Sequence, residues 1–262
     1  MSEQHQKFLR KLKKRKVSVV FLQIGFLIAF FALWELLTRF EVLDPFIFSS
    51  PTAVARIIRK LYLQNNLISH VSATVIETVL GFLISTIAGT LIAIVLWWNS
   101  LIKDVSQPYL VTLNSLPKIA LGPIIIIWVG AGKAAIITMA VMICIIITII
   151  SMLTGFTTVD KEKLMLLKSL HATKFQILTK LIIPSNIPNF ISVLKINVGL
   201  SWVGTIMGEY LVSREGIGYL IVYGSQVFQL DLVMASTVIL CIMAAGMYGA
   251  VAFLEKVISK RF

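Results

Sequence analysis

Residues 134–154 read AAIITMAVMICIIITIISMLT, an uncharged run of 21 residues. An α-helix rises about 1.5 Å per residue, so about 20 apolar residues cross the roughly 30 Å hydrocarbon core of a bilayer. The whole chain has the same character, because 58% of its 262 residues are hydrophobic, 14% are charged and its mean hydropathy is +0.91. This composition excludes a disordered chain and a disulfide-stapled secreted domain, and it indicates an integral membrane protein.

Five further apolar runs of similar length flank this stretch. A membrane-spanning chain must satisfy its own backbone hydrogen bonds, and the alternating strands of a barrel are not seen in the sequence. We therefore predict an all-α membrane protein, a bundle of six transmembrane helices. The predicted spans are residues 17–37, 71–98, 109–130, 134–154, 188–211 and 232–255. Residues 1–16 then form a basic cytoplasmic N-terminus, and residues 17–262 form the transmembrane domain.

The basic residues are distributed unevenly along the chain. The formal net charge is +12, and seven of the 24 basic residues lie between Lys7 and Lys16, next to the first span. With the N-terminus inside, the inner loops and ends carry 16 basic residues and the outer loops carry 6. The positive-inside bias thus predicts that both termini are cytoplasmic. Because most of the charge is explained in this way, we expect a lipid membrane and no nucleic acid as a partner.

Small residues recur at every fourth position of the second predicted span. Such residues allow the backbone of another helix to approach closely, and we expect tight packing within one bundle rather than a dedicated dimer contact. The residues are Gly81, Ser85, Gly89 and Ala93, and the pattern returns at Gly204 with Gly208 and at Gly246 with Ala250.

A long connection of about residues 156–187 separates the fourth and fifth spans, and loops of this length are usually functional. It reads as two short amphipathic helices, with Asp160 and Thr173 as their N-caps and Pro184 as the end of the second. Five lysines make the segment basic, which is typical of the cytoplasmic side. Such helices could lie on the lipid interface. The run from Leu164 to Leu167 covers most of the first helix, which favours a protein partner instead.

Several motifs resemble the inner-membrane permease subunits of bacterial ABC importers. The similarity is strongest to the nitrate, sulfonate and taurine branch, which includes importers of thiamine precursors. The motifs are KSLHAT at 168–173, LIIP at 181–184, Gly208-Glu209 and GIGYLI at 216–221, extended by Leu116-Pro117, Gly122-Pro123, Trp128-Val129-Gly130 and Ser50-Pro51-Thr52. The resemblance implies a bundle of the type I ABC importer permease kind, with a cytoplasmic helix-turn-helix coupling loop.

The family's loop motif is Glu-Ala-Ala, three residues, Gly, nine residues and Ile-x-Leu-Pro. In this chain Met165-Leu166-Leu167 stand at the first three positions and His171 stands at the glycine, while Pro184 ends the motif. The spacing is kept although the residue types differ. If the glycine position requires a positive φ, His is among the less unfavourable replacements, but is still more strained than Gly.

The resemblance also implies partners. The coupling loop would dock into a groove of a cytoplasmic ATPase subunit through Leu164, Leu167, Leu170, His171, Ala172 and Phe175. This chain lacks a phosphate-binding loop Gly-x-x-x-x-Gly-Lys-[Ser/Thr], so ATP hydrolysis would belong to a separate subunit and the chain would not be an enzyme. The implied complex contains two ATP-binding subunits, a second permease copy as a homodimer and an extracytoplasmic solute-binding protein, in the bacterial inner membrane. The implied solute is a sulfonate-, nitrate- or taurine-type anion or a thiamine-precursor-type molecule.

A polar line marks the fifth predicted span. Asn197, Ser201, Thr205 and Glu209 recur every four residues, on one broad side of an apolar helix. Polar groups at membrane depth are costly unless they are paired or face a wet cavity, so this line is a candidate translocation path, and hydrogen bonding between helices is the alternative. Asn114 and Ser115 are further candidates. We predict no metal site, no cofactor and no catalytic group.

Two other function classes fit an apolar bundle. One is a secondary transporter driven by an ion gradient, which would work without an ATPase. The other is a membrane scaffold, which would need no solute path along the fifth span.

Overall fold

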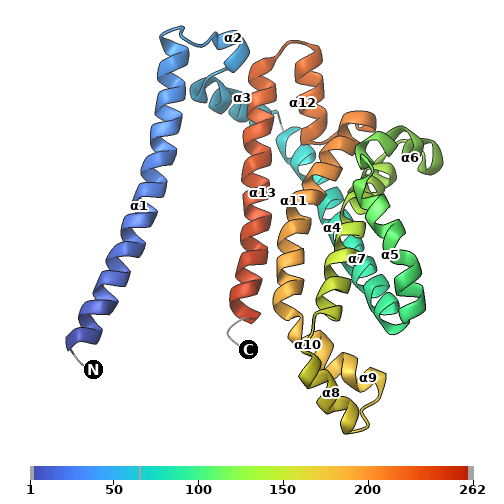
Figure 1. Ribbon diagram of the computed structural model, residues 1–262. Coiled ribbons are helices and arrows are strands. Elements are labelled where there is room, and N and C mark those ends of the chain that lie inside the picture. Colours follow the sequence, from blue (N-terminus) through green and yellow to red (C-terminus); the bar gives the residue numbers. More distant parts are fainter. Residues whose placement is uncertain (1–2, 65, 259–262) are drawn as a thin grey trace.

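The computed structural model describes residues 3–64 and 66–258. The first two residues of the predicted segment 1–16 and the last four of the predicted domain 17–262 lie outside the described residues. All regular structure in the described part of the chain is helical (Figure 1). The helices are α1 (Glu3–Arg39), α2 (Pro45–Phe48), α3 (Pro51–Leu63), α4 (Asn66–Trp98), α5 (Ser100–Ser115), α6 (Gly122–Val129), α7 (Lys133–Thr157), α8 (Lys161–Ser169), α9 (Lys174–Ile177), α10 (Ile183–Ser185), α11 (Ile187–Val212), α12 (Ile217–Gln226) and α13 (Leu230–Ile258).

Five described helices are long and apolar enough to cross a membrane: α1 from Val17 onward, α4, α7, α11 and α13. Helix α7 lies between α4 and α11 and contacts both along its length, which makes these three helices the centre of the bundle. Helix α13 packs on α11 and α12, and α1 stands apart from the bundle except at its end near α2 and α3 (Figure 1).

The predicted third span, residues 109–130, is not one straight helix. Helix α5 ends at Ser115, and the segment Lys118–Val129 leaves it at an angle of 88°, so the count of six spans holds only when this bent pair is taken as one. The break follows from Pro117, which has no N–H to donate and disfavours a helical conformation at the preceding residue. Leu116 is accordingly extended, with φ −68° and ψ 138°.

The two ends of the bundle carry different elements. The start of α1, the end of α13 and the helices α8 and α9 lie at one end, whereas α2, α3, α6 and α12 lie at the opposite end (Figure 1). The first described helix therefore begins, and the last one ends, at the end of the bundle that carries the 156–187 loop, as expected for an even number of crossings.

The predicted close packing of small residues is confirmed for α4 and α11. A Cβ at Gly81 would lie 2.6 Å from the Cβ of Ala140 on α7, and a Cβ at Gly204 would lie 2.5 Å from the Cα of the same Ala140. Gly89 meets Thr148 on α7 in the same way. These contacts lie within one chain. Gly246 on α13 has no atom within 4 Å of such a Cβ, so the pattern there makes no helix contact in the described residues.

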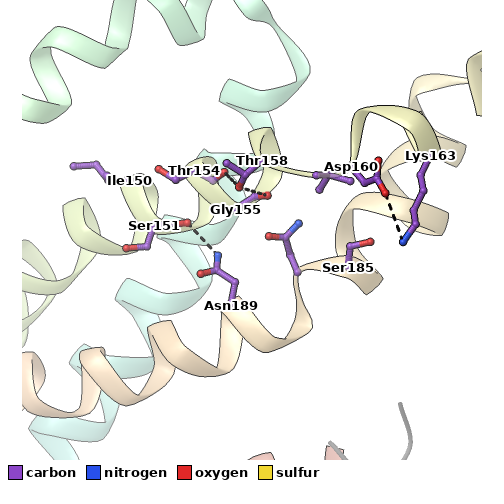
Figure 2. A pocket seen from close by; sticks show the side chains of 11 residues that line it. Ile150, Ser151, Thr154, Gly155, Thr158, Asp160, Lys163, Ser185 and Asn189 are labelled. Carbon is purple, nitrogen blue, oxygen red and sulfur yellow. Dashed lines mark hydrogen bonds and ion pairs between the residues drawn. The ribbon is translucent and has the colours of Figure 1, made fainter. Parts of the chain in front are cut away.

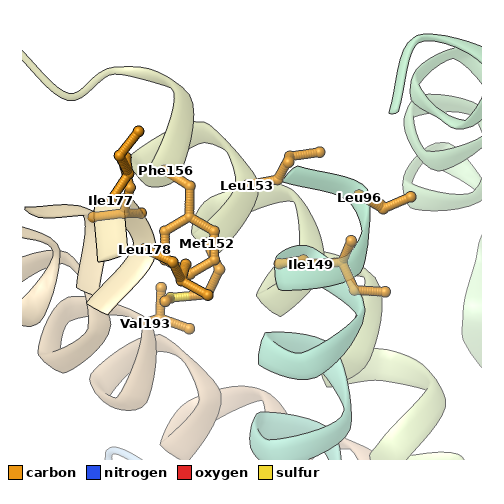
Figure 3. Close-up of a cluster of buried hydrophobic side chains, with 10 residues drawn as sticks. Leu96, Ile149, Met152, Leu153, Phe156, Ile177, Leu178 and Val193 are labelled. Carbon is orange, nitrogen blue, oxygen red and sulfur yellow. The ribbon is translucent and has the colours of Figure 1, made fainter. Parts of the chain in front are cut away.

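A large apolar cluster fastens the loop to the bundle (Figure 3). It joins the ends of α4 and α7 to the start of α11, with Phe156 and Met152 of α7 at its centre. Ile177 and Leu178, from the second loop helix, are 6% exposed each and belong to the same cluster. The loop is therefore part of the folded bundle rather than an appendage on its surface.

Candidate functional site

The two predicted loop helices and their caps are confirmed. The Asp160 carboxylate accepts from Glu162 N at 2.9 Å at the start of α8, and Thr173 and Gln176 form a reciprocal capping box at the start of α9. Pro184 does not end the second helix, which continues to Ser185 through a π-helical turn at Leu178–Ile182. A proline at 184 cannot donate to the carbonyl of Lys180, and the wider turn just before it accommodates this missing bond.

His171 takes the positive φ that the family's glycine position suggested, with φ +56°. It follows α8 in a Schellman arrangement, because His171 N donates to Lys168 O and Ala172 N donates to Leu167 O, both at 3.0 Å. The left-handed residue reverses the chain between α8 and α9. A histidine tolerates this conformation at a moderate cost that a glycine would avoid.

The apolar residues of the loop divide into two faces. Leu164, Leu167 and Ala172 pack against the apolar cluster of the bundle. The outer face consists of residues whose side chains are 60–70% exposed, namely Met165, Leu166, Leu170 and Phe175. Of the six residues predicted to dock, Leu170, His171 and Phe175 thus point away from the bundle, and the other three help to hold the loop on it.

The polar line of α11 lies inside the protein. Asn197, Ser201 and Thr205 have no exposed surface, and Glu209 is 1% exposed. The Asn197 amide donates to the hydroxyl of Thr86 on α4 at 3.1 Å and to that of Thr148 on α7 at 2.8 Å. In this conformation Asn197 holds α11 against its two neighbours, and such bonds contribute about 0.6 to 2 kcal/mol each. Ser201 donates instead to Val198 O of its own helix at 2.9 Å.

The remaining predicted polar residues are scattered. Asn114 and Ser115 are exposed at the end of α5, where Lys118 Nζ lies 3.3 Å from the Asn114 side-chain oxygen. They are not part of the α11 line. Lys195, outside this line, forms an ion pair with Glu255 on α13 at 2.6 Å.

A polar cavity of about 590 Å³ opens beside the loop, between the end of α7, the start of α8 and the start of α11 (Figure 2). Asn189 crosses it and donates to Ser151 O at 3.1 Å. Gly155 faces Asn186 and Asn189 so closely that a side chain there would overlap both. Sequence reasoning missed this cavity, because its polar residues are spread over three elements and show no periodicity.

Residues 81–262 match the family described as the binding-protein-dependent transport system inner membrane component. The chain belongs to this family. The permease is 28% identical over 195 residues to the formylaminopyrimidine transport permease ThiX of Halalkalibacterium halodurans, covering 74% of this chain and 77% of that protein. It is 21% identical over 230 residues to the taurine transport permease TauC of Escherichia coli, covering 86% and 84%.

The permease also resembles a solved structure. It superposes on a chain from the inward-facing MetNI methionine ABC transporter with a TM-score of 0.65 and 16% identity, covering 74% of this permease and 97% of that chain. This likeness shows the type I importer fold. With the family, it establishes the protein as a multi-pass membrane permease subunit of an ATP-driven importer and not itself an enzyme. The family implies ATPase and binding-protein partners, and it does not favour a secondary transporter or a scaffold.

Proposed function

We propose that two copies of this permease assemble with two cytoplasmic ATP-binding subunits and receive a small solute from an extracytoplasmic binding protein. The solute is a sulfonate-, nitrate- or taurine-type anion or a thiamine-precursor-type molecule. The named activities of the taurine and formylaminopyrimidine relatives support this substrate range. Both termini and the 156–187 loop lie in the cytoplasm in this assembly, and the positive-inside bias supports that orientation.

The observation that carries the proposal is the outer face of the loop, formed by Met165, Leu166, Leu170 and Phe175. Large apolar side chains on a polar, lysine-rich segment mark a docking surface when they gather in one place. The opposite side of the loop already packs on the bundle, so the exposed residues are free for another subunit. A groove on the ATPase accepts them.

The loop is well connected for transmitting movement. Its second helix runs through Ser185 almost directly into α11, with Asn186 as the one residue between them. Lys174 donates to Trp98 O at the end of α4 at 3.4 Å, which ties the loop to a third helix. The polar cavity is lined by Asp160 and Lys163 from the loop and by Asn189 from α11. A push on the loop by the ATPase therefore reshapes the inner mouth and moves α11.

The solute path in this proposal follows α11. Its polar line of Asn197, Ser201, Thr205 and Glu209 is buried in the described conformation, where Asn197 bonds to α4 and α7. A shift of α11 would open that line to water. The opposite side of α11 is exposed at Ile196, Gly199 and Val203, where a second copy can approach. Asn114 and Ser115, exposed at the bend after α5, supply further polar groups to the path.

The assembly can be tested by expressing the permease together with its ATPase and binding protein. Native mass spectrometry should give two permease chains and two ATPase chains in one complex, because each permease copy carries one docking loop and each loop binds one ATPase. Uptake into vesicles should require ATP and the binding protein, and should stop when the phosphate-loop lysine of the ATPase is replaced. A complex with one permease copy, or uptake that continues without the ATPase, would contradict the proposal.

The orientation gives a separate prediction. A reporter fused after residue 60, in α3, should lie outside the cell, and one fused after residue 170, in the loop, should lie inside, because these elements occupy opposite ends of the bundle (Figure 1). Alkaline phosphatase should therefore be active only at the first position, and green fluorescent protein only at the second. The same side for both fusions would overturn the orientation.

A further inference from the structure

Two carboxyl groups meet inside the bundle at the end opposite the loop. Glu77 on α4 is 2% exposed and Glu209 on α11 is 1% exposed, and their carboxyl groups are in hydrogen-bonding contact. Glu77 Oε2 and Glu209 Oε1 have no donor among the described residues. Neither carboxyl group belongs to an ion pair in the described part of the chain. A hydrogen bond between two carboxyl groups requires a proton on one of them.

Glu209 also forms the N-terminal cap of another helix. Its Oε2 accepts from Gly218 N at 2.6 Å. Gly216 has φ +111°, and a side chain at Gly216 or Gly218 would overlap the Glu209 carboxyl group. The first turn of α12 is therefore built around this carboxylate, which favours a negative charge on it because the free N–H groups at a helix N-terminus attract anions.

Side chains of α4 bind the preceding N–H groups of α12. Gly216 N donates to His70 Nδ1 at 3.0 Å, and Ile217 N donates to Thr74 Oγ1 at 2.8 Å. Three consecutive backbone N–H groups at the start of α12 thus donate to side chains of α4 and α11. Helix α12 is attached to the rest of the bundle at its N-terminus by these polar contacts, and Glu77 supports the last of them.

The charges decide how many protons the pair carries. Two buried carboxylates in contact would repel each other strongly, as like charges sharing a site do, and one proton removes this repulsion. Since Glu209 accepts from Gly218 N at the start of α12, it keeps the charge, and Glu77 carries the proton and donates to it. We propose that Glu77 and Glu209 form a one-proton clamp that positions the start of α12 against α4 and α11, and that loss of this proton releases α12.

This clamp deepens the proposed function, because α12 lies at the end where that proposal puts the solute-binding protein. Proton exchange has a route, since a cavity of about 450 Å³ reaches Glu77 from that end. Other titratable or charged groups face the pair from each neighbouring element: His70 on α4, Lys133 on α7, Tyr210 on α11, Arg214 and Glu215 in the following loop and Tyr219 on α12.

The clamp can be tested without measuring transport. The background is the assembled complex with Cys144→Ala and Cys241→Ala. In this background the labelling rate of Ile217→Cys reports how accessible the buried first turn of α12 is. The labelling rate of Ser225→Cys, on the exposed last turn of α12, gives the intrinsic pH dependence of the thiol reaction. From about pH 7.5 to about pH 9.5 an imidazole stays neutral, so His70 does not interfere. We expect the labelling-rate ratio of the buried to the exposed cysteine to rise by about tenfold, which corresponds to about 1.4 kcal/mol of lost clamping.

In Glu77→Gln the amide can donate to Glu209 at every pH, so the rise should disappear. Glu209→Gln, whose amide can still accept from Gly218 and donate to Glu77, should flatten the response as well and serves if the first variant does not fold. The control Glu215→Gln removes a nearby carboxylate outside the contact and should leave the rise intact.

An equal rise in the parent and in Glu77→Gln would overturn the clamp. So would a ratio that changes when choline replaces sodium at constant pH, since the pair would then bind a cation. Either result would leave the proposed assembly and orientation standing.

Discussion

Replacing Phe175 by Asp is expected to abolish copurification of the ATPase subunit while the permease still folds and inserts. Phe175 is 63% exposed on the outer face of the loop and lies outside the apolar cluster of the bundle, so the change removes little packing within the permease. In the complex its side chain would fill an apolar groove, where an unpaired carboxylate costs several kcal/mol. Because each 1.4 kcal/mol is about tenfold in affinity, we expect binding to weaken by about a hundredfold or more. Pull-down of tagged permease with quantified ATPase measures this loss.

Two variants at matched positions make the result specific. Phe175→Leu keeps an apolar side chain and should retain the ATPase. Leu167→Asp introduces the same charge on the inner face of the loop, which packs on the bundle, and should lower the amount of folded permease rather than ATPase binding alone. ATPase retention by Phe175→Asp at the level of Phe175→Leu would show that this face does not dock.

Local signals explain why the loop was predictable. Asp160 and Thr173 cap helices because their side chains bond to N–H groups only two or three residues away, and such bonds depend little on the rest of the fold. The spacing of the loop motif shared with the permease family likewise located the left-handed turn at His171. The extent of the second helix was less predictable, because the π-helical turn before Pro184 is stabilised by burial of Leu178 and Ile182 in the bundle.

The candidate path was harder to predict from sequence for a physical reason. Periodicity identified the side of α11 that carries Asn197 and Glu209, but it could not tell whether that side faces water or other helices. The partners of Asn197 lie 49 and 111 residues away in the chain, and those of Glu209 include a helix start that has no hydrophobic period. The bend after α5 was missed because the hydrophobicity of residues 109–130 continues across Pro117 and outweighed the proline as a signal.

Gly204→Val is expected to prevent the permease from accumulating as a folded protein. A Cβ at Gly204 would lie 2.5 Å from the Cα of Ala140 and 3.0 Å from its N, so the obstacle is the backbone of α7 and not a side chain that can rotate away. Gly81 on α4 contacts the same Ala140 from another side, so α7 cannot shift away from α11 without overlapping α4. Overpacking a tight core typically costs about 1–3 kcal/mol and occasionally more, and a branched side chain at this three-helix contact belongs at the upper end. Gel-filtration yield and the midpoint of thermal unfolding measure the effect.

Alanine variants at Gly204 and Gly199 separate this steric cost from helix propensity, because both glycines lie in α11. Replacing a helical glycine by alanine gains about 1 kcal/mol wherever space is free. Gly199 has no atom within 4 Å of a new Cβ, so Gly199→Ala should raise the unfolding midpoint. Gly204→Ala receives the same gain but meets the α7 backbone, so it should lower the midpoint. Shifts of the same sign in both variants would mean that α11 and α7 do not approach as closely as Ala140 and Gly204 require.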